Sequence, residues 1–184
     1  MNQSLAELET GRGRLGSSEG EKRLIGLISD THISSEADEL PQRVIDAFKD
    51  VSLILHAGDL VCLKVVKDLE KIAPVVAVYG NMDPPEVRAR LPEMNSIRIL
   101  GWNIGVVHDA GALWGKREMR RIAKENEFDA LVFGHTHRAY LETEPTVYVN
   151  PGSPTKPVPP FITKPSVALL RVAQSGVEPS IVKL

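Results

Sequence analysis

The chain has 184 residues, a length that favours one domain with a single sizeable core. Hydrophobic residues make up 42% and charged residues 25%, as in globular proteins and unlike disordered ones, and the net charge of −2 argues against bulk, sequence-independent binding of nucleic acid. The single cysteine, Cys62, excludes an intrachain disulfide. Because the sequence holds neither a hydrophobic leader nor an apolar run of membrane-spanning length, we expect no membrane association and a cytoplasmic protein.

The first half of the chain predicts repeated strand–helix units. Residues 1–21 are rich in Gly, Ser and Glu with few apolar positions, which indicates a flexible leader before a single domain at 22–184. Continuous apolar runs then alternate with stretches whose apolar residues recur at helical spacing. The predicted strands are 24–28, 53–55 and 75–79, and the predicted helices are 40–51, 65–72 and a short one at 84–91.

The second half departs from this alternation. Gly101 and Trp102 separate two apolar segments and predict a hairpin, and a basic amphipathic helix precedes the next strand. Residues 151–165 hold six of the 13 prolines and are predicted to form a loop, because proline lacks the donor that a sheet needs. The predicted elements are strands 96–100 and 103–107, helix 116–123, strands 131–133 and 146–150, and a closing hairpin of 167–172 with 177–184.

Polar side chains follow five of the predicted strands. In an open α/β sheet the carboxyl ends of the strands lie along one edge, so residues far apart in sequence can meet there. Glycines precede Asp59, Asn81 and His135, as expected where a strand turns sharply at a site, although ordinary turns also use glycine. The candidate metal ligands are Asp30, His32, Asp59, Asn81, His108, His135 and His137.

These candidates predict a centre with two divalent metal ions. They are too many for one tetrahedral ion, and two neighbouring cations need a shared negative group between them, which a carboxylate supplies best. Imidazole, carboxylate and amide ligands without a thiolate suit Mn, Fe, Zn, Ni or Co and not a structural zinc or a calcium cage. Among these we take Mn as the first choice.

With these motifs in this order, the chain resembles the calcineurin-like metallophosphoesterases, most closely their short single-domain phosphodiesterase branch, from Leu24 to about Ser153. The resemblance implies an α/β fold of four layers, an αββα sandwich of two mixed sheets flanked by helices (the metallo-dependent phosphatase fold). It also implies one ion held by Asp30, His32, Asp59 and His137, and a second held by Asp59, Asn81, His108 and His135, so that Asp59 bridges.

The expected reaction is hydrolysis of a small phosphodiester by a hydroxide that the two ions hold and activate. We assign catalysis to Asp59, Asn81 and His108, and expect Asp83 to support the ligands from behind them. His56, three residues before Asp59, is expected either to support the ligands in the same way or simply to pack in the core.

Two positions depart from the family pattern. Many relatives place a histidine after the motif asparagine to protonate the leaving group, whereas this chain has Met82. Loss of a general acid costs on the order of 10²–10⁴ in rate for a poor leaving group, so we predict faster turnover of activated aryl phosphodiesters than of alkyl ones. Asp109 stands where relatives often have glycine, which puts a carboxylate near an anionic substrate.

Several interpretations stay open. The residues expected to face the substrate are Met82, Asp109, Thr136, Gly152 and Ser153, but Asp109 is equally suited to cap a hairpin end, and residues 150–153 to form an ordinary turn. The alternative functions are a phosphomonoesterase or nuclease of the same fold, and a non-catalytic scaffold of the retromer type. The intact ligand set argues against the scaffold. The sequence leaves open the physiological substrate and the subunit number, a homo-oligomer included.

Overall fold

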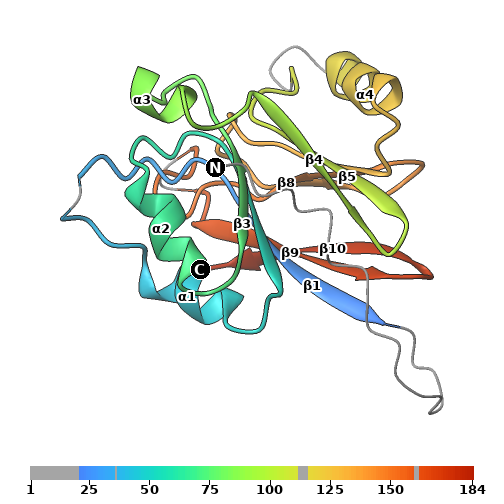
Figure 1. Ribbon diagram of the computed structural model, residues 1–184, viewed down its shortest axis with the longest axis horizontal. Helices are drawn as coiled ribbons and strands as arrows, with labels where there is room; N and C mark the ends of the chain where they lie inside the picture. Colours follow the sequence, from blue (N-terminus) through green and yellow to red (C-terminus); the bar gives the residue numbers. More distant parts are fainter. Residues whose placement is uncertain (1–20, 36, 112–115, 160–161) are drawn as a thin grey trace.

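Two five-stranded sheets face each other, with helices against their outer faces (Figure 1). The computed structural model describes residues 21–35, 37–111, 116–159 and 162–184. The predicted leader, except for Glu21, lies outside these residues. Among the helices that the structure describes, none is both long and apolar enough to cross a membrane.

The first sheet collects the three predicted strand–helix units and the closing hairpin. Its strand order is β10-β9-β1-β2-β3, in which β1, β2 and β3 run parallel, while β9 is antiparallel to both β1 and β10. Helices α1 (Gln42–Phe48) and α2 (Lys64–Glu70) connect the parallel strands. The strands are β1 (Lys22–Ile28), β2 (Leu53–Ala57), β3 (Val75–Val78), β9 (Ser166–Ala173) and β10 (Gly176–Lys183).

The second sheet is also mixed, with the order β4-β5-β6-β8-β7. Its central strands β5, β6 and β8 run parallel, and β4 and β7 pair antiparallel at the two edges. Helix α3 (Pro85–Arg88) precedes this sheet, and α4 (Lys116–Glu125) joins β5 to β6. The strands are β4 (Met94–Ile99), β5 (Trp102–Val107), β6 (Ala130–Val132), β7 (Tyr140–Glu142) and β8 (Val147–Asn150).

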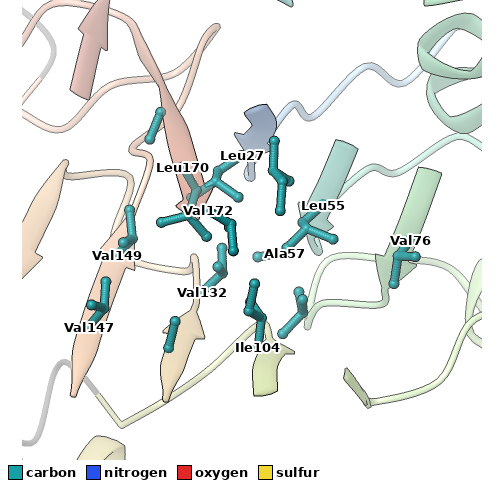
Figure 2. Packing of buried hydrophobic residues seen from close by; sticks show 14 of the residues in the cluster. Leu27, Leu55, Ala57, Val76, Ile104, Val132, Val147, Val149, Leu170 and Val172 are labelled. Atoms are coloured by element: carbon teal, nitrogen blue, oxygen red, sulfur yellow. The ribbon is translucent and has the colours of Figure 1, made fainter. Parts of the chain in front are cut away.

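Three buried apolar clusters lie between the four layers. The first fills the space between the sheets, where Leu27 and Leu55 of one sheet meet Ile104 and Val132 of the other (Figure 2). The second packs α1 and α2 on the first sheet, and includes Phe48. The third packs α4 on the second sheet. Its members include Met119, Ala123, Leu131 and Phe133. The first cluster removes the inner face of both sheets from water and the other two each remove one outer face, so the stacking of layers follows from the apolar patterns of the elements.

The predicted α/β fold with four layers is confirmed. The simpler picture of a single open sheet edge is wrong, because the strands that carry the candidate ligands are divided between the two sheets: β1, β2 and β3 lie in the first, and β5 and β6 in the second. Strand β7 was also not predicted. Its three residues are too few to show an alternating pattern.

Candidate metal centre

All seven candidate ligands follow the carboxyl ends of strands, as predicted, and they converge from both sheets. Asp30 and His32 follow β1, Asp59 follows β2, and Asn81 follows β3. From the second sheet, the loops after β5 and β6 supply His108, His135 and His137. The structure thus brings together residues that lie up to 107 positions apart, from Asp30 to His137.

A first set of ligands is formed by Asp30, His32, Asp59 and His137, whose ligand atoms all lie within 4.8 Å of one another. His137 donates its Nδ1–H to the carbonyl of Lys156 at 2.6 Å, which leaves Nε2 with a free lone pair. That Nε2 lies 3.1 Å from His32 Nε2 and 3.4 Å from Asp30 Oδ1. Metal–ligand bonds of about 2.1 Å put neighbouring ligand atoms about 3.0–3.4 Å apart, so these distances fit one ion.

A second set gathers around the side-chain oxygen of Asn81. Asn81 Oδ1 lies 2.9 Å from His108 Nε2 and 2.9 Å from His135 Nδ1. Since His108 donates its Nδ1–H to the carbonyl of Ala57 at 2.8 Å, the neutral ring turns a lone pair toward an oxygen that is itself an acceptor. Either a proton on Nε2 or a cation among these atoms relieves this opposition. The donor set therefore fits a divalent ion.

Asp59 stands between the two sets. Its Oδ2 lies 3.7 Å from His32 Nε2 and 3.3 Å from His108 Nε2, while Oδ1 accepts the backbone N–H of Met82 at 2.7 Å. Burial alone would raise the pKa of Asp59, but hydrogen bonding with His108 and its charge outweigh burial and hold the pKa below its ordinary value. One oxygen of a charged carboxylate is thus available to both sets.

Burial and charge pull the imidazoles of the two sets in opposite directions. Burial lowers the pKa of His32 to about 4, so this ring is neutral at pH 7 and offers a lone pair. Burial also opposes the charged form of His108, but its hydrogen bond and proximity to Asp59, together with Asp30, outweigh burial and raise the pKa of His108. Burial raises the pKa of Asp30, whose side chain has no exposed surface.

Backbone strain is concentrated at these residues. Among the described residues, eight that are not glycine have a positive φ, and five of the eight are candidate ligands. Their φ angles lie between 45° and 72°, a region that costs free energy for a residue with a side chain and that persists where the surrounding structure enforces it. These five are Asp30, His32, Asp59, His135 and His137.

The glycines that precede the ligands are needed, as predicted. Gly58 has a φ of 84°, and a Cβ atom there would lie 2.7 Å from His108 Nδ1. At Gly80 a Cβ atom would lie 2.2 Å from Asp59 Oδ1, closer than any contact allows. A side chain at either position would displace a candidate ligand, so the close approach of these loops requires glycine.

Comparison with known proteins identifies the family. The calcineurin-like phosphoesterase superfamily domain matches residues 24–175. The chain belongs to this superfamily. It is 43% identical over 165 residues to a probable metallophosphoesterase of Methanothermobacter thermautotrophicus, a match that covers 87% of this chain and 92% of the relative. It is 32% identical over 141 residues to a phosphodiesterase of Methanocaldococcus jannaschii, covering 70% of this chain and 82% of that protein.

A solved structure agrees with this assignment. Vps29 of Entamoeba histolytica, crystallised with Zn²⁺, superposes with a TM-score of 0.69 at 25% identity, over 87% of this chain and 98% of Vps29. The predicted superfamily is therefore confirmed, and so is the class of metal-dependent phosphoric ester hydrolase. The family and the cluster of ligands together indicate divalent metal binding.

In this member of the superfamily, Asp83 and His56 do not reach the two sets but support the loops that carry them. Asp83 is buried and accepts three backbone N–H groups, from Asp59 at 3.0 Å, Gly80 at 2.7 Å and Val61 at 2.6 Å. His56 has no exposed surface, and its Nε2 lies 3.1 Å from the hydroxyl of Thr31, between Asp30 and His32 in sequence. Burial lowers the pKa of His56 to about 3, so the ring is neutral.

The residues expected to face the substrate are placed differently from one another. Met82 is 58% exposed beside Asn81, at the surface of the second set. Asp109 accepts the backbone N–H of Gly111 at 2.7 Å, which is the hairpin-end cap given above as its alternative role. Thr136 is half-buried, and its hydroxyl accepts a hydrogen bond from Asn150 at 3.1 Å.

Gly152 and Ser153 are corrections to the expected pocket rim, because the structure buries both. Ser153 has no exposed surface, and its hydroxyl donates to the carbonyl of Asp30 at 2.7 Å. These residues lie behind the first set and not in front of it. The resemblance located the segment near the site, but the sequence carries no signal for the direction in which these short side chains point.

Arg88 is a supporting residue that sequence analysis missed. Its Nε donates to the carbonyl of Asp83 at 2.8 Å and its Nη2 to the carbonyl of Asn81 at 2.6 Å, while the guanidinium lies 5.3 Å from the centre of the Tyr79 ring. The planar fork of arginine thus spans two carbonyls on either side of Met82. An arginine five residues after an aspartate is too common a pattern to predict this contact.

Proposed function

We propose that the protein is a phosphodiesterase that works with two divalent metal ions. One ion is held by the first set (Asp30, His32, Asp59 and His137) and the other by the second set (Asp59, Asn81, His108 and His135). The observation that carries the proposal is the position of Asp59 Oδ2, 3.7 Å from a ligand nitrogen of the first set and 3.3 Å from one of the second. A shared carboxylate is what two neighbouring cations require.

The chain's own groups prepare this chemistry. Two divalent ions, when bound, supply hydroxide at neutral pH and neutralise the charge that develops on the phosphate. Hydrogen bonds from Nδ1 to the carbonyls of Lys156 and Ala57 hold His137 and His108 with Nε2 directed at the two sets. The hydrogen bond from Met82 N–H leaves Asp59 Oδ2 as the free oxygen. No protein nucleophile is needed.

The leaving group sets the substrate preference. Met82, exposed beside Asn81, has no proton to give to a departing alkoxide. Esters with a leaving group that is stable as an anion, such as nitrophenolate, do not need that proton. We therefore propose small diesters as substrates, with activated aryl esters turned over faster than alkyl esters, in line with the relative of 32% identity that is a phosphodiesterase.

The deciding experiment is hydrolysis of bis(p-nitrophenyl) phosphate by metal-free protein to which Mn²⁺ or Ni²⁺ is added, with metal content measured in parallel. Asn81→Ala and His108→Ala are expected to abolish most of the activity, since each removes a ligand of the second set. Asn95→Ala is the matched control, because Asn95 lies on β4, outside both sets, and its side chain accepts the N–H of Ser96. Equal activity in all four proteins would contradict the proposal.

Three further functions are separated by the same assay with other substrates. Faster hydrolysis of p-nitrophenyl phosphate or of single-stranded DNA would favour the monoesterase or the nuclease over the diesterase. The structural likeness to Vps29 favours the scaffold as a second candidate. Because that Vps29 is itself complexed with Zn²⁺, metal binding alone does not decide between enzyme and scaffold. A protein that binds ions fully but hydrolyses none of the three substrates would favour the scaffold over the enzyme.

A further inference from the structure

The residues from Asn150 to Lys156, here called the 150–156 segment, comprise the last residue of β8 and the first part of the proline-rich loop, and they lie next to the first set. This segment contains the two buried residues that were expected at the pocket rim. Its side chains and carbonyls bond to two of the three loops that supply the first set, the one after β1 and the one after β6.

On the β1 side, the segment binds the backbone between the two ligands. The hydroxyl of Ser153 donates to the carbonyl of Asp30 at 2.7 Å, and the hydroxyl of Thr155 donates to the carbonyl of Thr31 at 2.7 Å. Ser153 Oγ also accepts the backbone N–H of Lys156 at 2.7 Å, so the segment is tied to itself at the same atom. These bonds act on a stretch with positive φ at Asp30 and His32, where an unsupported backbone would relax.

On the β6 side, the segment holds both the loop and one ligand ring. Asn150 has no exposed surface, and its Nδ2 donates to the carbonyl of Gly134 at 2.7 Å and to the hydroxyl of Thr136 at 3.1 Å. The carbonyl of Lys156 accepts the Nδ1–H of His137 at 2.6 Å. That bond fixes both the tautomer and the direction of the ring, as partners of ligating histidines do.

We propose that the 150–156 segment is the positioning element of the first set: it holds Asp30, His32 and His137 in ligand geometry before any ion binds. The inference rests on the proposed function. Thr155 is its most specific residue, because its hydroxyl bonds to the backbone of the β1 loop and to no residue of the second set in the described chain. Groups that bond directly to a ligand are worth about 10- to 100-fold in metal affinity, and for Thr155, which bonds to the backbone between two ligands, we expect the lower end of that range.

The test compares Thr155→Val, which keeps the shape and loses the hydroxyl, with Thr155→Ser, which keeps the hydroxyl. Thr163→Val is the matched control, because the Thr163 hydroxyl bonds to the carbonyl of Val158 in the same loop. Mn²⁺ is titrated into each metal-free protein, with bound ions counted by calorimetry and their pairing read from the electron paramagnetic resonance spectrum. Two neighbouring Mn²⁺ ions give a spin-coupled spectrum, and one gives a single-ion spectrum.

Thr155→Val is expected to weaken one of the two binding steps by about tenfold or more and to show the single-ion spectrum at Mn²⁺ concentrations that pair the ions in the wild type. Thr155→Ser and Thr163→Val are expected to match the wild type. Three results for Thr155→Val would overturn the inference and leave the proposed function intact. They are wild-type affinity for both ions, equal weakening of both binding steps, and a loss of thermal stability with no change in metal binding. A wild type that binds no pair of ions would overturn the proposed function itself.

Discussion

The two ligand sets share Asp59 but differ in how the structure holds them. The first set is the more enclosed of the two: its His32 and His137 are half-buried, but Asp30 has no exposed surface, and neither have the supporting residues Asn150, Ser153 and His56. The second set reaches the surface through Asn81, which is exposed and whose loop is held by the exposed Arg88, whereas its His108 is buried. Buried hydrogen bonds fix a geometry more firmly than exposed ones, because water competes for the exposed bonds.

On the proposed function, this difference makes the first set the preformed half of the centre and the second set the adjustable half. We expect the first set to bind its ion more tightly and the second set to exchange its ion with solvent more readily. Asp59 connects the two halves, and substitutions elsewhere are expected to act mainly on one of them. The predictions that follow test this division, beginning with the residue common to both.

Asp59→Asn is expected to have the largest effect. The substitution keeps the shape but removes the negative charge that two cations share, so the second ion meets unrelieved repulsion. We expect hydrolysis of bis(p-nitrophenyl) phosphate to fall on the order of 10³-fold, and the metal content to fall to one ion or fewer per chain. Asp46→Asn, on the exposed face of α1, is the control. Two bound ions and activity within about tenfold of the wild type would refute the shared role of Asp59.

Met82→His tests whether the second set lacks a general acid that protonates the leaving group. A histidine at this position places a proton donor beside Asn81, where the chain now has a thioether. General acids contribute on the order of 10²–10⁴ when well placed, so we expect alkyl phosphodiester turnover, relative to aryl turnover, to rise about 10²-fold. Met94→His, on β4 and 42% exposed, is the matched control. An unchanged ratio would show that Met82 does not determine the preference.

The gathering of the ligands was predictable, and so was the support from Asp83, whereas the support from Arg88 and Thr155 was not. Gly–Asp, Gly–Asn and Gly–His after apolar runs marked strand ends with chemistry, and the structure brings these residues together. The same runs do not encode how many sheets they form, because a strand buried on both faces has one pattern in either case. The supports depend on carbonyl groups, as with Arg88 and Thr155, and every residue has a carbonyl. Sequence therefore carries little signal for them.

His56 tests the enclosed half through pH. Its pKa is about 3 in the folded protein and about 6.5 in the unfolded chain, so between pH 7 and 5 the unfolded chain takes up a proton that the folded protein does not. The stability present above the unfolded pKa is therefore lost as the pH falls, by about 2 kcal/mol over this interval. In metal-free protein, we expect the free energy of unfolding of the wild type to fall by that much more than that of His56→Gln.

Denaturant unfolding at both pH values measures this difference. Because His32 and His108 are present in both proteins, their own contributions, which have opposite signs, cancel in the comparison. An equal fall in the two proteins would mean that the folded protein protonates His56 as easily as the unfolded chain does. The His56 ring beside Thr31 would then be accessible to water, and the first set would not be the more enclosed of the two.

Arg88→Lys is expected to have the smallest effect, confined to the exposed half. A lysine keeps the charge but cannot span the carbonyls of Asn81 and Asp83 with a rigid fork. We expect binding of the second ion to weaken about tenfold and binding of the first to stay unchanged. Tenfold is the lower end of the loss in metal affinity for supporting groups, because water competes for hydrogen bonds at this exposed position. Arg90→Lys, two residues further on and also exposed, is the control. Equal weakening of both ions by Arg88→Lys would show that the loop after β3 and the 150–156 segment do not act on separate halves, and that the centre tightens or loosens as one unit.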